Sequence, residues 1–205
     1  MRLLASDIGA TNGRFAIFEA QGADLVLKDQ ICLPTQEFAS IHDLLGHLQA
    51  RNADMSFDRF ERVVLAVPGP VSQGKALLPN VSWNIDLDEL PETFCLLNDF
   101  AAQAYACLSP VSADARLIKG NGRIARGSVA VVGAGTGIGF ALAIPPDDGR
   151  TRALVVPSEL CHAMFPLAGA TEEAFRRFLL QQCNRPYLSP DLVVSAKGLE
   201  RIHQF

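Results

Sequence analysis

The sequence has few aromatic residues and no excess of basic charge. Aromatic residues make up 7% of the chain, and 18 Lys and Arg against 22 Asp and Glu leave a net charge of −4. Because the basic residues are scattered, no phosphate-neutralising face is expected, and nucleic acid is not an expected partner. No biased tract is present, which excludes disorder, collagen and coiled coil. The mean hydropathy of +0.18 is that of a globular chain with an aliphatic interior.

The chain also lacks paired cysteines, long apolar runs and a signal-peptide pattern. Its five cysteines are Cys32, Cys95, Cys107, Cys161 and Cys183. An odd number without a CxxC pair favours reduced, buried thiols over a disulfide framework or a zinc site. The N-terminal segment reaches Asp7 too early for a signal peptide, and no apolar run could cross a bilayer. We therefore expect a cytoplasmic protein without a membrane partner.

Hydrophobic periodicity in the first half predicts an α/β arrangement. The predicted strands are residues 2–8, 14–18 and 24–33, which form an antiparallel meander, then 62–67 and 94–97; the predicted helices are 37–50 and 99–108, with a short helical turn near 86–90. Asn98 and Asp99 then lie where a strand ends and a helix begins. Open α/β sheets bind their ligands at the carboxyl ends of strands.

The second half begins with the same pattern of strand, glycine turn and strand. The predicted strands are 128–132, 140–144 and 152–156, and residues 171–183 form an amphipathic helix. Ser189 and Pro190 suit the N-cap and first position of a final helix that ends at Phe205. The similarity of the two halves predicts two related lobes, 1–110 and 111–205, with a cleft between them.

Two turns rich in small residues separate predicted strands. The first is Asp7–Arg14 and the second is Gly133–Gly139. The backbone N–H groups of such turns can bind phosphate oxygens, and Asp7 could face a metal ion. Neither turn matches GxGxxG or a Walker A motif. Each taken alone could be a plain hairpin, but two of them, one at the start of each lobe, favour a pair of phosphate-binding loops.

Polar groups elsewhere suggest catalysis and ligand binding. Asp99 could take a proton from a substrate hydroxyl beside Asn98, or it could serve as a helix N-cap. Glu159 and His162 could bind sugar hydroxyls or a metal, or be a surface acid and a core histidine. The segment 80–84, with the only Trp, could offer amides to a polyhydroxy ligand or bury its ring.

Six segments in order give the chain a resemblance to a known family. They are DIGATNGR, VPGPV, NVSWNID, LLNDFAAQAYA, VVGAGTGIG and PSELCH. Together they resemble the bacterial ATP-dependent glucokinases, within the superfamily of sugar kinases, actin and Hsp70, from Leu3 to about Leu199. The resemblance implies a ribonuclease-H-like, two-lobe α/β fold, ATP and Mg²⁺ as cofactors, and D-glucose or a related hexose as substrate.

The resemblance also assigns roles to individual residues. The first phosphate motif is Asp7, Gly9, Ala10, Thr11 and Asn12, with Asp7 towards the metal, and the second is Gly133, Gly135, Thr136 and Gly137. The sugar-binding residues are Asn98, Asp99, Glu159, His162 and Asp191, and Asp99 is also the catalytic base. The implied reaction is phosphoryl transfer to the primary hydroxyl of the sugar.

The chain departs from the family pattern in three respects. Ser158, Leu160 and Cys161 stand where the family carries glycines, and Asp191 is one methylene shorter than the usual Glu. The chain is also shorter than these kinases, as if truncated at its C-terminus with the second lobe incomplete. The alternatives are therefore an inactive sugar-binding or regulatory protein and a kinase of another hexose. A shortened lobe would expose apolar surface, which leaves a homodimer open.

Overall fold

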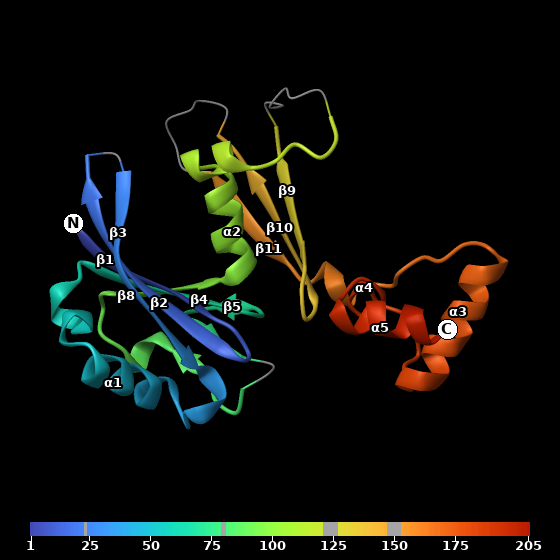
Figure 1. Ribbon diagram of the computed structural model, residues 1–205, viewed down its shortest axis with the longest axis horizontal. Helices are drawn as coiled ribbons and strands as arrows, with labels where there is room; N and C mark the ends of the chain where they lie inside the picture. The colour runs from blue at the N-terminus through green and yellow to red at the C-terminus, as the bar shows by residue number, and fades with distance from the viewer. Residues whose placement is uncertain (23, 79–80, 121–126, 147–152) are drawn as a thin grey trace. The chain divides into compact units, whose positions relative to one another are not determined.

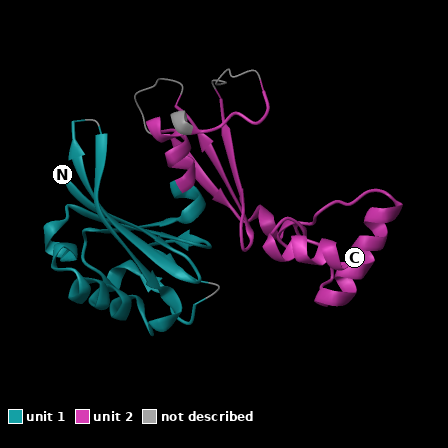
Figure 2. Ribbon diagram, in the orientation of Figure 1, with its two compact units in different colours: residues 1–102 teal, residues 103–205 magenta. Residues whose placement is uncertain are grey.

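The structure is a mixed α/β fold with two compact parts. The computed structural model describes residues 1–22, 24–78, 81–120, 127–146 and 153–205 (Figure 1). Contacts within the chain divide it into unit 1, Met1–Ala102, and unit 2, Gln103–Phe205 (Figure 2). This division lies inside helix α2 (Asp99–Cys107), whereas the sequence placed a lobe boundary at residue 110.

Unit 1 is built on a sheet of five strands. The strands, in their order across the sheet, are β3 (Asp24–Pro34), β2 (Asn12–Gln21), β1 (Arg2–Ile8), β4 (Arg62–Val67) and β8 (Phe94–Asn98). The first three form the expected antiparallel meander, while β4 and β8 run parallel to β1. The helix α1 (Ile41–Arg51) lies between β3 and β4 in the chain, and the Ser40 hydroxyl caps it by accepting from the Asp43 N–H at 3.0 Å.

The core of unit 1 lies between this sheet and α1. Leu4, Phe15 and Leu65 on the strands and Leu44 on the helix are all fully buried. Alternate residues of β1 and β2 and the apolar face of α1 supply this core, which is why the period-2 and period-3.6 patterns of the sequence predicted these elements correctly.

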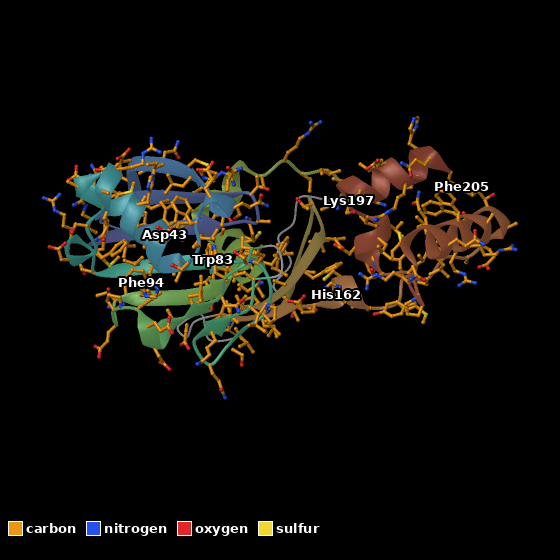
Figure 3. All side chains as sticks on the ribbon, turned by 90° about the horizontal axis from the view of Figure 1, so that it is seen from below. Asp43, Trp83, Phe94, His162, Lys197 and Phe205 are labelled. Carbon is orange, nitrogen blue, oxygen red and sulfur yellow. The ribbon has the colours of Figure 1, made fainter. Side chains whose placement is uncertain are left out.

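The single tryptophan belongs to the core of unit 1. Trp83, labelled in Figure 3, is 6% exposed, and its indole Nε1 donates a hydrogen bond to the carbonyl of Phe38 at 3.0 Å. Of the two interpretations of segment 80–84, the buried ring is therefore the correct one for Trp83. Asn80 lies outside the described residues.

Several short elements escaped the sequence prediction. The strands β5 (Val71–Ser72), β6 (Lys75–Ala76) and β7 (Ile85–Asp86) form a small antiparallel sheet. The described residues also include five 3₁₀ turns that were not expected: η1 (Thr35–Glu37), η2 (Ala53–Met55), η3 (Phe57–Arg59), η5 (Pro110–Asp114) and η6 (Leu160–His162). A sixth, η4 (Leu87–Glu89), confirms the short helical turn predicted near residues 86–90. Two-residue strands are too short to show an alternating pattern, so their pairing depends on tertiary contacts.

Unit 2 contains an antiparallel sheet and three further helices. The strands lie in the order β11 (Leu154–Ser158), β10 (Ile138–Ile144) and β9 (Val129–Ala134), and the helices are α3 (Ala170–Cys183), α4 (Pro190–Val193) and α5 (Ala196–Gln204). The sequence placed the last strand at 152–156; residue 152 lies outside the described residues.

The prediction of a single final helix from Ser189 to Phe205 was wrong, because the structure has two helices there. The chain leaves helical geometry at Val194, and the Ser195 hydroxyl starts a new helix by accepting from the Gly198 N–H at 3.0 Å. Ser189 makes no capping hydrogen bond with its side chain. Ser195 is itself a preferred N-cap residue, and a new helix begins after it.

One face of the unit 2 sheet is apolar and exposed. Leu142 pairs with Val156 and Ile144 with Leu154, so these four side chains point to the same face, and all are at least 38% exposed. Ala141 and Ala143, which point to the other face, are buried. An exposed apolar patch on a sheet is typical of a surface that another segment or molecule covers.

Two further expectations can be compared with the structure. Cys161 is buried, but Cys32 and Cys107 are exposed, so the expectation of buried thiols was wrong for these two. Both lie on elements with one solvent-facing side, where an apolar neighbourhood in the sequence does not ensure burial.

Within the described residues, no helix combines the length and apolar character that crossing a bilayer requires.

Replacement of a core leucine tests this account of unit 1. Leu65→Ala should lower the free energy of unfolding by about 2–5 kcal/mol, because it leaves a cavity beside β1 and β8. Leu25, on β3, is 55% exposed, and Leu25→Ala should change stability by less than about 0.5 kcal/mol. Urea denaturation followed by Trp83 fluorescence reports on unit 1 alone, and equal effects of the two substitutions would contradict the assignment.

The exposed face of the unit 2 sheet can be tested with a dye. We expect the 205-residue chain to bind the apolar dye ANS and to self-associate through this face. The double variant Leu142→Thr with Val156→Thr should reduce both, measured by dye fluorescence and by analytical ultracentrifugation. Leu25→Thr in unit 1 is the matched control, and a double variant that behaves as the parent does would contradict the prediction.

Candidate functional site

The first glycine turn connects β1 to β2 through three residues. Gly9 N–H donates to the carbonyl of Asn12 at 2.9 Å, and Thr35 N–H donates to the carbonyl of Thr11 at 2.9 Å. Carbonyls of the turn are therefore used internally, which gives the loop a defined shape. Gly9, Ala10 and Ile8 also line a small crevice together with Pro68, Leu78 and Val81.

Asp7, at the end of β1, has a cationic neighbour. Its Oδ2 accepts a hydrogen bond from Arg14 Nη1 at 3.0 Å, and the Asp7 side chain is 57% exposed. Asp7 and Arg14 face each other in the β1–β2 register, so the hairpin itself creates the pair. The carboxylate is therefore held at the mouth of the turn and remains accessible to solvent.

Asn98, at the end of β8, makes three side-chain hydrogen bonds. Its Nδ2 donates to the carbonyl of Gly69 and to Asp99 Oδ1, both at 3.0 Å, and its Oδ1 accepts from Ala101 N–H at 3.0 Å. The last contact has the geometry of a helix N-cap. The cap that the sequence assigned to Asp99 as the alternative is thus made by Asn98, which is 7% exposed.

Asp99 begins helix α2 with its carboxylate oriented by two donors. Its Oδ1 accepts from Phe100 N–H at 2.8 Å and from the Asn98 amide. A carboxylate in the first turn of a helix is favoured by the positive end of the helix dipole. Gly69, which anchors the Asn98 amide, has φ of +86°, a conformation that glycine adopts without steric cost.

The strand register brings the first glycine turn and Asp99 to the same edge of the unit 1 sheet. Asp7 on β1 is aligned with Ala66 on β4, and Val67 on β4 with Asn98 on β8. These three strands are parallel, so the first turn and Asp99 both follow carboxyl ends at the same edge. They are two strand spacings apart, roughly 10 Å.

The second glycine turn connects β9 to β10 in unit 2. Gly135 N–H donates to the carbonyl of Gly137 at 2.7 Å, which closes a tight turn around Thr136. The N-terminus of α5 supports the turn, because Ala196 N–H donates to the carbonyl of Gly135 at 2.9 Å. The turn is therefore held by residues about 60 positions later in the chain.

Asp191 contacts this turn directly. Its Oδ1 accepts from Ile138 N–H at 3.0 Å, and a Cβ added to Gly137 would lie 2.5 Å from the same oxygen. The resemblance implied that Asp191 binds sugar, and in the structure its carboxylate anchors the second glycine turn. Sequence reasoning missed this anchoring, since residues 53 positions apart give no local signal.

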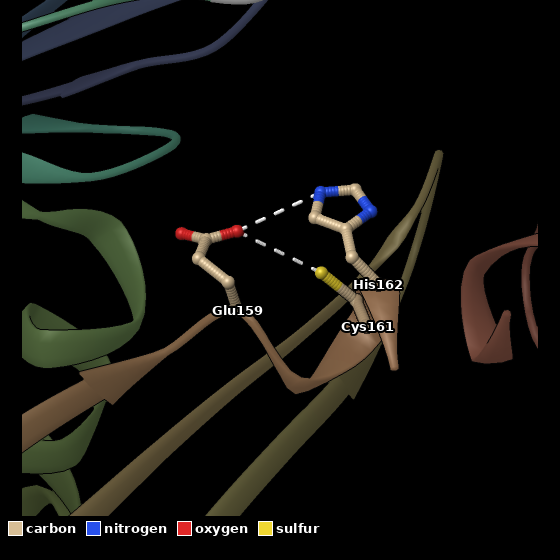
Figure 4. Close-up of side chains that lie close together, drawn as sticks. All are labelled: Glu159, Cys161 and His162. Carbon is tan, nitrogen blue, oxygen red and sulfur yellow. Dashed lines mark hydrogen bonds and ion pairs between the residues drawn. The ribbon is translucent and has the colours of Figure 1, made fainter. Parts of the chain in front are cut away.

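Glu159, Cys161 and His162 converge around turn η6 (Figure 4). Glu159 Oε2 is 3.7 Å from His162 Nε2 and 3.8 Å from Cys161 Sγ. The backbone supports this arrangement, because His162 N–H donates to the Glu159 carbonyl at 3.0 Å. The alternative of a core histidine was wrong, since the His162 side chain is 68% exposed.

Cys161 was missed as a member of this group, although it lies between the two predicted residues. Burial raises the pKa of the Cys161 thiol, and the nearby carboxylates of Glu159 and Asp191 raise it further. The thiol therefore lies in a buried environment with negative charge nearby. The signal in the sequence was the spacing Glu-x-Cys-His, in which the third group needed for a metal site is already present.

A substitution at the second turn tests the role of Asp191. Gly137→Ala should displace the Asp191 carboxylate and break its hydrogen bond to Ile138, at a cost of about 1–3 kcal/mol. Hydrogen–deuterium exchange should then be faster at Ile138. Gly135→Ala is the matched control, because the nearest atom to its added Cβ is 4.0 Å away.

The double variant of Gly137→Ala with Asp191→Ala completes this test. If the clash with Asp191 is the cause, Gly137→Ala should add little exchange once Asp191→Ala is present. Fully additive effects would mean that Gly137 acts independently of Asp191.

Comparison with known proteins gives a consistent family. The glucokinase of Caulobacter sp. (strain K31) is 30% identical over 98% of this chain and 60% of its own length. The glucokinase of Nitrobacter hamburgensis is 32% identical over 97% of this chain and 60% of its own. The chain spans about 60% of the length of the curated relatives it matches.

Solved structures agree with the sequence relatives. A glucokinase from an Antarctic psychrotroph is similar with a TM-score of 0.76 and 26% identity, over 99% of this chain and 63% of that one. The glucokinase from Balamuthia mandrillaris, solved in complex with glucose, shares the fold with a TM-score of 0.66 at 18% identity, over 99% and 62% of the two chains. The glucokinase family model matches residues 4–205, which confirms the resemblance in the motifs: the chain belongs to the glucokinase family.

Proposed function

We propose that the protein transfers the terminal phosphoryl group of ATP to D-glucose, giving glucose 6-phosphate, with Asp99 as the general base. Family membership supports a hexose kinase, and the relatives named above are glucokinases. The observation that carries the proposal is the position of Asp99 at the same sheet edge as the first glycine turn.

The separation across that edge suits phosphoryl transfer. Two strand spacings, roughly 10 Å, leave room for a phosphoryl group near the turn and a sugar hydroxyl near Asp99. The Asn98 amide, itself anchored to the Gly69 carbonyl, holds Asp99 Oδ1 in place. Positioning of this kind accounts for much of the catalysis in phosphoryl transfer, because there is little covalent chemistry for the protein to perform.

Asp99 would act on the primary hydroxyl of the sugar. The carboxylate accepts the hydroxyl proton while the hydroxyl oxygen forms a bond to the terminal phosphorus of ATP. The bond from that phosphorus to the bridging oxygen breaks, and ADP leaves with its electron pair. The product is the sugar phosphate, and the proton on Asp99 is released to solvent afterwards.

The two glycine turns have the features of phosphate-binding loops. In the first, Gly9, Ala10 and Thr11 form a short connection between strands and Asn12 begins β2; in the second, Gly133, Gly135, Thr136 and Gly137 occupy or border the turn. The close approach of Asp191 to Gly137 shows that this turn has no space for a side chain on that side. Backbone N–H groups in such turns bind phosphate oxygens.

Asp7 is the residue that we assign to Mg²⁺. Its exposed carboxylate at the mouth of the first turn is the hard oxygen ligand that this ion takes together with water and substrate phosphates. The ion, when bound, neutralises charge on the phosphates. Arg14, across the hairpin, holds the carboxylate through an ion pair of 3.0 Å.

For the sugar, we assign Asn98 and Asp99 of unit 1 and Glu159, His162 and Asp191 of unit 2. Glu159 and His162 have exposed side chains that can exchange hydrogen bonds with hydroxyl groups. Asp191 keeps one carboxylate oxygen on Ile138, so a sugar contact would use its other oxygen. The glucose present in the Balamuthia mandrillaris structure supports a hexose as the ligand.

The architecture that we propose is ribonuclease-H-like, with two related lobes. The strand order β3-β2-β1-β4-β8, with an antiparallel meander and two parallel additions, supports this for unit 1. The three described strands of unit 2 are also antiparallel and lie in sequence order. A glycine turn joins the first two strands of each meander, as expected for related lobes.

Replacement of the proposed base tests the function. Asp99→Asn keeps an oxygen that can accept from Phe100 and Asn98, so the fold should be retained, while proton acceptance is lost. Formation of glucose 6-phosphate, followed in a coupled assay with Mg-ATP, should fall by about 10²–10⁴-fold. Glucose binding measured by calorimetry should persist, and the exposed Glu92→Gln is the matched control.

The outcomes separate the candidate functions. An unchanged rate in Asp99→Asn would overturn Asp99 as the base. If the unsubstituted chain binds glucose but forms no product, this chain is a sugar-binding protein and the kinase proposal fails for it. Turnover with another hexose but not with glucose would replace the substrate and keep the reaction.

A further inference from the structure

Turn η6 brings together three different ligand atoms of the kind that hold transition metals. The carboxylate of Glu159, the thiol of Cys161 and the imidazole of His162 place an oxygen, a sulfur and a nitrogen within 4.8 Å of one another. Among the residues that the structure describes, no other group of His, Cys, Asp and Glu meets this criterion. Figure 4 shows that Glu159 Oε2 points towards both partners.

Two of the three separations between ligand atoms are close to those of tetrahedral coordination. Zinc bond lengths of about 2.0–2.3 Å place neighbouring ligand atoms roughly 3.3–3.7 Å apart at the edges of a tetrahedron. The observed distances from Glu159 Oε2 are 3.7 Å to His162 Nε2 and 3.8 Å to Cys161 Sγ. Shifts of a few tenths of an ångström along these two edges would therefore be sufficient.

Access and charge also favour a cation. The side chains of Glu159 and His162 are 49% and 68% exposed, so an ion can reach them from solvent, while Cys161 forms the buried side of the group. The Glu159 carboxylate contributes a negative charge to the group. A borderline-soft ion that accepts sulfur, nitrogen and oxygen fits this set, whereas Mg²⁺ prefers oxygen ligands alone.

We propose that Glu159, Cys161 and His162 bind Zn²⁺, with water in the fourth position. Zn²⁺ would bind the same side chains of Glu159 and His162 that we assign to the sugar. Zn²⁺ and the hexose would therefore exclude each other. This second part rests on the proposed function, whereas binding of Zn²⁺ does not.

The metal site is tested first, without sugar. We expect the 205-residue chain to take Zn²⁺ from a chromophoric chelator with one ion per chain, and Co²⁺ to give the absorption of a tetrahedral cobalt thiolate. Cys161→Ser should abolish the thiolate band and weaken Zn²⁺ binding by about tenfold or more, since loss of even a supporting residue costs that much. His162→Gln, at an exposed position, should weaken binding similarly.

Cys183→Ser is the matched control, because Cys183 is a partly buried thiol in the same unit that lies outside the group. Circular dichroism would show that each variant is folded. Zn²⁺ binding that is lost in Cys183→Ser, or that is unchanged in both Cys161→Ser and His162→Gln, would overturn the site. A cobalt spectrum without a thiolate band would overturn the assignment of Cys161 as a metal ligand.

The competition is tested by titrating glucose into the chain with and without bound Zn²⁺. We expect the apparent affinity for glucose to fall as Zn²⁺ rises, and chelation with EDTA to restore it. Glucose binding that is insensitive to bound Zn²⁺ would overturn the competition and leave the metal site intact. Absence of glucose binding in the metal-free chain would overturn the proposed function, while the chelator and cobalt results would still decide the metal site.

Discussion

The hydrogen bonds of the Asn98 side chain are the interactions on which the candidate catalytic site of unit 1 depends. They join the end of β8 to the glycine that follows β4, cap helix α2 and orient Asp99. Phe100 N–H donates to the same oxygen of Asp99 as the Asn98 amide does, so two donors orient this carboxylate. Because Asn98 is buried, its hydrogen bonds form away from competing water, where leaving a partner unsatisfied is costly.

In unit 2, too, a polar side chain fixes the backbone of the candidate site, and here that side chain belongs to Asp191. Asp191 and the N-terminus of α5 hold the turn between β9 and β10 through hydrogen bonds to Ile138 and Gly135. The Asp191 carboxylate also helps to raise the pKa of the Cys161 thiol, after burial and the Glu159 carboxylate.

The two units differ in how fully they bury their apolar residues. Unit 1 packs a five-stranded sheet against α1 around a continuous core. The core cluster in unit 2 lies among its helices, at Phe175, Leu179, Leu188 and Val193, while one face of its sheet carries exposed aliphatic side chains. The chain matches curated relatives over about 60% of their length, and the open face belongs to the part that it shares with them.

The sequence by itself determined the main helices and strands, both glycine turns and the junction at Asn98 and Asp99, because these depend on local periodicity and turn chemistry. It also determined the family, since ordered motifs survive where overall identity is near 30%. Only the tertiary structure decided that Asn98 is the cap, that Asp191 supports the second turn, that Trp83 is a core residue and that Cys161 faces Glu159. Each of these depends on a side chain meeting a partner whose position is set by packing, and hydrophobic periodicity carries no information about such contacts.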